Sequence, residues 1–214
     1  MKAARNIFAA ILLFGILSAE IIDRIAATVG DHIISEQEIV HEIRIAALLN
    51  REPAKVSAST KHAAAERLVK QELIRREMDE THYPLPEKTE ADPLEDQVIA
   101  SYGGEPAYMS ALAASGLTRN DVRNELWWQL TTLRFIDYRF RPAVHVPQSA
   151  ISTYYDQQAA KWKAQGQKNI PSLEDSRDSI EKILTEELVD QALDHWLTEQ
   201  RRRLNVRYHE EALQ

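Results

Sequence analysis

The apolar positions from Ile21 onward first follow the pattern of extended chain and then the pattern of a helix. Ile21–Val29 is predicted to be a strand, the Gly-Asp pair after it a tight turn, and His32–Ile34 a short returning strand. Ser35 then begins a helix, with Glu38 three positions later completing a capping box. A strand–turn–strand–helix unit is therefore expected near the start of the chain.

Most of the remaining chain has the spacing of amphipathic helices, interrupted by proline, glycine and capping residues. Little glycine and much Ala, Leu, Glu, Gln and Arg agree with this pattern. The predicted helices are Ser35–Asn50, Ser59–Thr81, Asp92–Tyr102, Pro106–Ala114, Thr118–Phe140, one that Ser149 caps and that fades by Gly166, and a last one that begins at Ser172.

Two of the predicted helices carry long apolar stripes. The stripe on Thr118–Phe140 consists of Val122, Leu126, Leu130 and Leu133, flanked by Trp127, Ile136 and Phe140. The stripe on the last helix consists of Ile180, Leu184, Leu188, Ala192 and Trp196. Each stripe is expected to face the core.

The chain closes with Asn205–Tyr208, which has the composition of a strand. We expect it to pair with the N-terminal hairpin and so to join the two ends of the chain; the alternative is a frayed tail. The predicted fold class is mainly α, a multi-helix bundle with a small β-sheet formed by the N-terminal hairpin and the C-terminal strand.

Residues 1–19 have the pattern of a signal peptide. Lys2 and Arg5 precede the apolar run Ile7–Leu17, and the small residues that follow place cleavage after Ala19. An uncleaved membrane anchor is the alternative, although the run falls short of the ~20 residues that span a bilayer. The expected location is the periplasm, with residues 20–214 forming the mature domain and no stable membrane insertion after cleavage.

The charge balance restricts the class of partner. The leader holds two of the 26 basic residues and none of the 33 acidic ones, so the mature chain has a net charge of −9 with histidine neutral. Nucleic acid and anionic lipid both favour a basic surface, and neither is expected to be the main partner. The chain has no cysteine, so its stability cannot depend on disulfides.

Four segments in combination resemble the N-terminal chaperone domain of the SurA-like family, which includes periplasmic SurA-, PpiD- and PrsA-type proteins. The first, IIDRIAATVGDHIISEQEI, is similar to the strand–turn–strand–helix opening of that domain. The others are SGLTRNDVRNEL at Ser115–Leu126, VPQSAISTYYD at Val146–Asp156, and LDHWLTEQRRRLNVRY at Leu193–Tyr208. The resemblance implies a helical chaperone domain that spans nearly the whole mature chain.

One departure from the family is as informative as the resemblance. Family members commonly carry a parvulin-type prolyl isomerase domain between the Tyr-Tyr helix and the final helix. Here only the stretch from Asp156 to Asp175 separates those helices, which is too short for a folded domain. The sequence therefore predicts the chaperone module without the isomerase.

No motif for covalent chemistry or for a cofactor is present. The seven histidines are scattered, with no two at i, i+4 spacing, and there is no H-E-x-x-H, phosphate loop or dinucleotide fingerprint. We predict no catalytic residue, no metal site and no cofactor.

Large apolar and aromatic side chains are the candidates for peptide binding, because adaptable side chains accept many sequences. Their alternative role is to close the core between helices. The candidate residues are Tyr102, Tyr108, Met109, Leu112, Trp127 and Trp128.

The expected function is that of a periplasmic holdase-type chaperone or assembly factor, which binds unfolded or outer-membrane polypeptides without catalysis. A dedicated interaction subunit with one fixed partner is the first alternative, and a residual peptidyl-prolyl isomerase is the second. The sequence leaves open whether the protein is a homodimer in which strands are exchanged between two copies.

Overall fold

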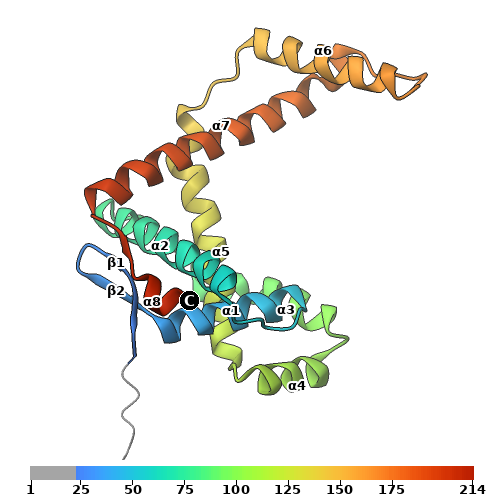
Figure 1. Ribbon diagram of the computed structural model, residues 1–214. Coiled ribbons are helices and arrows are strands. Elements are labelled where there is room, and N and C mark those ends of the chain that lie inside the picture. Colours follow the sequence, from blue (N-terminus) through green and yellow to red (C-terminus); the bar gives the residue numbers. More distant parts are fainter. Residues whose placement is uncertain (1–22) are drawn as a thin grey trace, which may run out of the picture.

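The computed structural model describes residues 23–214 as a crescent (Figure 1). The small sheet and most helices form a body, from which a pair of helices projects as an arm over a hollow. The predicted leader, its cleavage site after Ala19 and the alternative membrane anchor lie outside the described residues. Within the described part, the fold is mainly α with a small sheet, as the sequence predicts.

The sheet joins the two ends of the described chain. β1 (Ile25–Val29) lies between β2 (His32–Ser35) and β3 (Arg207–Tyr208), and both pairings are antiparallel. Gly30 has a φ of 60°, which permits the tight turn, and its amide donates to the Leu204 carbonyl at 2.8 Å. The expected pairing of the C-terminal strand with the hairpin is confirmed, and it occurs within one chain.

The helices begin and end close to their predicted limits. Capping boxes form at Ser35 and at Thr118, and Gly116 adopts the left-handed conformation after the fourth helix. The α-helices are α1 (Glu36–Asn50), α2 (Ala58–Glu80), α3 (Asp92–Ser101), α4 (Glu105–Ser115), α5 (Arg119–Phe140), α6 (Gln148–Ala164), α7 (Leu173–Arg203) and α8 (Glu210–Leu213). Single 3-10 turns, η1 (Lys88–Ala91) and η2 (Arg141–Ala143), precede α3 and follow α5.

Two details of the predicted helices are wrong. Ser149 does not cap α6, because the helix already begins at Gln148 with Pro147 at the cap position. The chain also does not close at Tyr208: the single turn α8 follows, with Leu213 fully buried. One helical turn is too short to produce a periodic pattern, so α8 is defined by its packing rather than by its sequence.

Two hydrophobic clusters form the body. The first lies between the sheet, α1, α2, the C-terminal half of α5, the C-terminal half of α7, and α8. The second lies between α1, α3, α4 and the N-terminal half of α5. Because α5 changes partners along its length, the predicted stripe does not stay buried: Val122 and Leu126 lie in the second cluster, whereas Leu133 is 65% exposed.

The arm consists of α6 and the N-terminal half of α7, residues 148–188. Its buried side chains are Ile151, Ala159 and Ile180, and none of them belongs to either body cluster. The C-terminal half of α7 instead packs into the first cluster through Val189, Leu193 and Trp196. The single predicted stripe on this helix is therefore two stripes with different partners.

Candidate functional site

The structure separates the six residues that the sequence nominated for peptide binding. Tyr108 and Leu112 are buried in the second cluster, where Tyr102 also packs and donates from its hydroxyl to the Leu48 carbonyl at 2.7 Å. Met109, one residue along α4, is 46% exposed. These four side chains do not line one groove, and Tyr108 and Leu112 take the alternative role of closing the core.

The two tryptophans belong to different surroundings. Trp127 packs against the second cluster and donates from Nε1 to the Pro86 carbonyl at 3.0 Å. Trp128 packs against the first cluster and also lines a groove. Its Nε1 is buried without a hydrogen-bond partner, which leaves one strong donor unsatisfied. Of the six nominated residues, only Trp128 reaches this groove.

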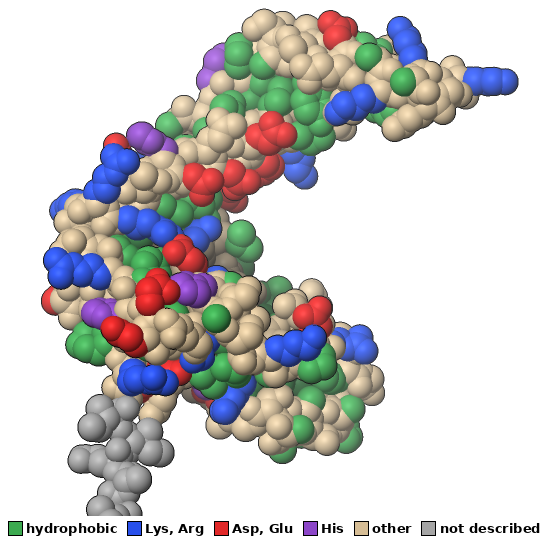
Figure 2. Space-filling view, in the orientation of Figure 1, with side chains coloured by type: hydrophobic (Ala, Val, Ile, Leu, Met, Phe, Trp, Pro, Cys, Tyr) green, Lys and Arg blue, Asp and Glu red, His purple; other side chains and the backbone are tan. Residues whose placement is uncertain are grey.

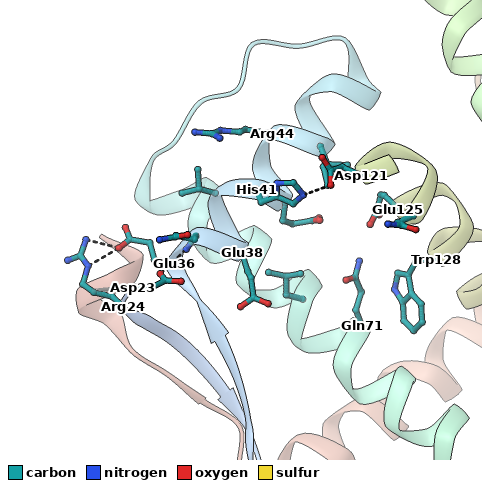
Figure 3. Close-up of a pocket in the computed structure, with 16 residues that line it drawn as sticks. Asp23, Arg24, Glu36, Glu38, His41, Arg44, Gln71, Asp121, Glu125 and Trp128 are labelled. Atoms are coloured by element: carbon teal, nitrogen blue, oxygen red, sulfur yellow. Dashed lines mark hydrogen bonds and ion pairs between the residues drawn. The ribbon is translucent and has the colours of Figure 1, made fainter. Parts of the chain in front are cut away.

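The Trp128 groove has a volume of about 1000 Å³ and lies where α1, α2 and α5 meet (Figure 3). Gln71 of α2 lies between Glu38 of α1 and Trp128 of α5 in this view. The residues that line the groove are Asp23, Arg24, Glu36, Gln37, Glu38, Val40, His41, Glu42, Arg44, Ile45, Leu68, Gln71, Asp121, Asn124, Glu125 and Trp128.

The groove continues past Trp128 toward the hairpin. A second hollow of about 230 Å³ shares Glu38, Leu68, Gln71 and Trp128 with it, and adds residues of β2 and the next turns of α2. Together they form an open path from the segment before β1, along α1, to the edge of β2. The added residues are His32, Ile34, Glu72 and Arg75.

Some carboxylates of the groove are neutralised by neighbouring cations. Glu36 pairs with Arg24 at 2.7 Å and accepts a hydrogen bond from Lys61 at 2.7 Å. Glu42, 6% exposed, accepts from Arg67 Nε at 2.7 Å. These pairs stabilise the walls of the groove and leave little charge for a ligand.

Other carboxylates of the groove have no Lys or Arg within ion-pair distance among the described residues. Asp23 accepts from the Gln37 amide, Glu38 is part of the cap of α1, and Glu125 accepts from Gln129 Nε2. Asp121 caps α5 and lies 3.6 Å from His41 Nε2. Among the positively charged residues of the groove, Arg44 has no carboxylate partner in the described chain.

The pKa values follow these surroundings. Burial, reinforced by the charge of Glu125 and opposed by Arg67, raises the pKa of Glu42 above its usual value. The hydrogen bond from Lys61 lowers the pKa of Glu36 despite some burial. Burial pushes the pKa of Asp121 upward, but hydrogen bonds from Thr118 outweigh it and the net shift is downward. The groove thus holds two carboxylates whose pKa is lowered, Glu36 and Asp121, and one, Glu42, whose pKa is raised.

A second candidate surface lies around the hollow under the arm. Figure 2 shows hydrophobic side chains gathered on the side of the arm that faces the hollow, beside a group of acidic side chains. The helices α5 and α7, which border the hollow in Figure 1, carry exposed large apolar side chains. They are Leu133 (65% exposed) and Tyr138 (66%) on α5 and Ile183 (41%) on α7. A shallow hollow of about 340 Å³ between α6 and α7 is lined by Ser149, Ala150, Thr153, Tyr154, Gln157 and Leu184.

Two other kinds of site are not found between residues 23 and 214. No group of three or more His, Asp or Glu side chains converges there in a way that could hold a metal ion. No helix of this stretch has the length and hydrophobicity to cross a membrane.

Sequence reasoning missed most of the Trp128 groove. Its walls are polar faces of α1 and α5, which look like any solvated helix surface in a single sequence. Val40 and Leu68 fall on helices that the periodicity predicts, but the pattern does not indicate which polar faces meet. A signal that could have found part of the groove is the excess of acidic over basic residues on α1, where three glutamates accompany one arginine.

A search of protein-family models found no match for this chain, and a search of curated proteins also found none. The resemblance to the SurA-like family consequently depends on the four sequence segments alone. The function is inferred below from the two surfaces.

Proposed function

We propose that the protein is a periplasmic holdase-type chaperone or assembly factor of the SurA-like kind, without the prolyl isomerase domain, which binds unfolded polypeptides without covalent chemistry. The observation that supports this most is the projecting arm with apolar side chains exposed around the hollow. Monomeric proteins rarely leave large apolar patches in water, and such patches commonly mark sites for other chains.

The geometry of the hollow suits an extended client better than a folded one. Two helical surfaces face each other across an open space, so a flexible chain could contact both at once. Many weak apolar contacts accept varied sequences, because they depend on area rather than on one hydrogen-bond pattern. The acidic side chains beside the apolar patch would keep a complex with an unfolded chain soluble.

The connection between α6 and α7 supports the absence of an isomerase. The residues between these helices run from Gln165 to Ser172, and they close the arm as a short turn. A domain inserted at this place would need far more chain than this turn provides. We therefore propose no isomerase activity.

The test is suppression of aggregation. Unfolded outer-membrane protein is diluted from denaturant into buffer with the purified chain, and light scattering is recorded. The wild type should suppress scattering in a saturable way for several unrelated clients. The double variant Leu133→Glu/Ile183→Glu should lose about tenfold in potency, because two exposed apolar side chains on the helices that border the hollow become charged.

Val56→Glu is the matched control, because Val56 is also about half exposed but lies before α2, away from the arm. It should suppress aggregation like the wild type. Equal potency of the double variant and the control would contradict the role of the hollow. No suppression by the wild type would contradict the chaperone function itself.

A dedicated interaction subunit is the second candidate, and the Trp128 groove favours it. The groove carries charged groups without a basic partner that are held in place by helix caps, Glu38 at the start of α1 and Asp121 at the start of α5, a feature of selective binding rather than of general capture. Strong binding of one folded partner, together with no suppression of client aggregation, would support this candidate over the first.

A further inference from the structure

The Trp128 groove has an unbalanced negative charge. Four carboxylates of the groove lack a Lys or Arg partner among the described residues: Asp23, Glu38, Asp121 and Glu125. Among the same residues, Arg44 is the one groove arginine that lacks a carboxylate partner. Carboxylates that line the same groove repel one another, and a bound cation relieves this repulsion. The upward influence of Glu125 on the pKa of Glu42 is a sign of the same negative field.

The groove also has an apolar part. Trp128, Leu68 and Val40 lie among the carboxylates, so the stem of a long side chain could rest on them while its charged end reaches an acid. An indole ring attracts a cation placed over its face, and negative neighbours strengthen that attraction. The lining therefore matches Lys or Arg better than it matches a purely apolar or an acidic side chain.

The shape of the lining indicates the form of the occupant. The groove and the adjoining hollow share Glu38, Leu68, Gln71 and Trp128 and together form one elongated path. An extended peptide can follow such a path and place a basic side chain among the carboxylates. Trp128 Nε1 is buried away from this path and contributes nothing to the choice of ligand.

We propose that the Trp128 groove binds an extended polypeptide segment that carries Lys or Arg side chains. This proposal rests on the proposed function, because it takes the segment to belong to an unfolded or flexible chain. The Trp128 groove is nevertheless a separate surface from the hollow under the arm. Phosphate-bearing ligands such as nucleic acid or anionic lipid are disfavoured, because their charge has the same sign as the groove.

The experiment measures binding of short labelled peptides to the whole mature chain by fluorescence anisotropy. One peptide contains an aromatic residue flanked by lysines, and its partner has glutamates in place of the lysines. The lysine peptide should bind at least about tenfold more tightly at low salt, and added salt should weaken it. Equal binding of the two peptides would overturn the proposal.

Two groove variants and one control locate the site. Glu125→Lys reverses a charge that, among residues 23–214, accepts a hydrogen bond from Gln129 on its own helix and from no other element, so the fold should be retained. It should weaken binding of the lysine peptide about tenfold. Trp128→Leu keeps apolar bulk but removes the aromatic face over which a cation could lie, and it should weaken the lysine peptide by about fivefold. Glu181→Lys makes the same charge change at an exposed site on the arm and should have no effect beyond a small loss common to all charge variants.

The outcomes separate this proposal from the chaperone function. If Glu125→Lys loses peptide binding but still suppresses aggregation, the groove and the hollow act independently and both proposals stand. If Glu125→Lys and Glu181→Lys weaken binding of the lysine peptide equally, the effect arises from the net charge of the protein and the groove proposal fails. Concentration-dependent self-association that competes with the peptide would assign the groove to a second copy of this chain and would also overturn the proposal.

Discussion

Glu42 shows how a single buried carboxylate reports on its surroundings. Its side chain faces the Trp128 groove from α1, accepts a hydrogen bond from Arg67, and lies near Glu125. Burial removes the water that stabilises a carboxylate, and the second acid adds repulsion. The pair with Arg67 offsets only part of these two effects, so the pKa of Glu42 is raised in the folded chain.

The raised pKa of Glu42 predicts a specific dependence of stability on pH. The folded chain holds the Glu42 proton at a pH where the unfolded chain, with a pKa of about 4.3, has released it. The contribution of Glu42 to the free energy of unfolding is therefore greatest below the unfolded pKa and falls as the pH rises through the folded pKa. Glu42→Gln should remove this fall, so the stability of the wild type relative to the variant should decrease as the pH rises above the unfolded pKa of about 4.3 and should level off once the pH exceeds the folded pKa.

Urea unfolding of the two proteins at several pH values checks this expectation. Glu125→Gln serves as a second comparison, because loss of its charge removes one cause of the shift and should make the fall shallower. A stability difference between wild type and Glu42→Gln that does not change with pH would contradict the assignment.

The C-terminal elements stabilise the body out of proportion to their length. β3 has two residues, and the amide of His209 extends its pairing to the Ala26 carbonyl at 2.9 Å. α8 then inserts Leu213 into the first cluster, while buried Lys61 donates to the carbonyl of Ala212 at 3.2 Å and to an oxygen of Gln214 at 2.7 Å. The turn that the sequence did not predict thus completes the core between β1 and α2.

Leu213→Ala tests the contribution of α8. The side chain is fully buried, so its truncation should lower the free energy of unfolding by about 2–4 kcal/mol, as for other leucines that leave a cavity. Leu85→Ala is the control, since Leu85 is about half exposed and should cost about 0.5 kcal/mol or less. Chemical denaturation measures both. Equal losses in the two variants would mean that α8 does not pack as described.

At the scale of the whole molecule, the arm and the body differ in how much apolar surface they bury. The body has two clusters that draw on helices from both ends of the chain, whereas the arm buries Ile151, Ala159 and Ile180 between two helices. A helical pair with so small a core should open more readily than the body, because local stability follows the density of buried contacts. Such opening would let the arm adapt to different clients.

Hydrogen exchange tests the difference, and α7 contains its own control. Amides of α6 and of the N-terminal half of α7 should exchange at least about tenfold faster than those near Val189, Leu193 and Trp196, which belong to the same helix but pack on the body. The amides of α2 should be protected as strongly as the C-terminal half of α7. Uniform protection along α7 would contradict a separately opening arm.

Local structure was largely predictable from the sequence. The capping boxes at Ser35 and Thr118, the hairpin turn at Gly30 and the helix end at Gly116 all depend on residues within a few positions of one another. The pairing of the two ends was also predicted, because Asn205–Tyr208 had the composition of a strand and the hairpin had a free edge. Among the candidate site residues, Trp128 alone was placed at a groove, whereas Tyr108 and Leu112 became core.

The sequence by itself determined most of the helices and strands, their approximate limits, and the negative charge of the chain, because these properties arise from nearby residues and from composition; the short α8 is the exception. Only the tertiary structure decided which face of each helix is buried. A long helix such as α5 or α7 changes partners along its length, so one periodic stripe becomes two, and Leu133 lies in water. For the same reason, polar faces of α1, α2 and α5 that are far apart in the sequence meet around Trp128 and form the groove.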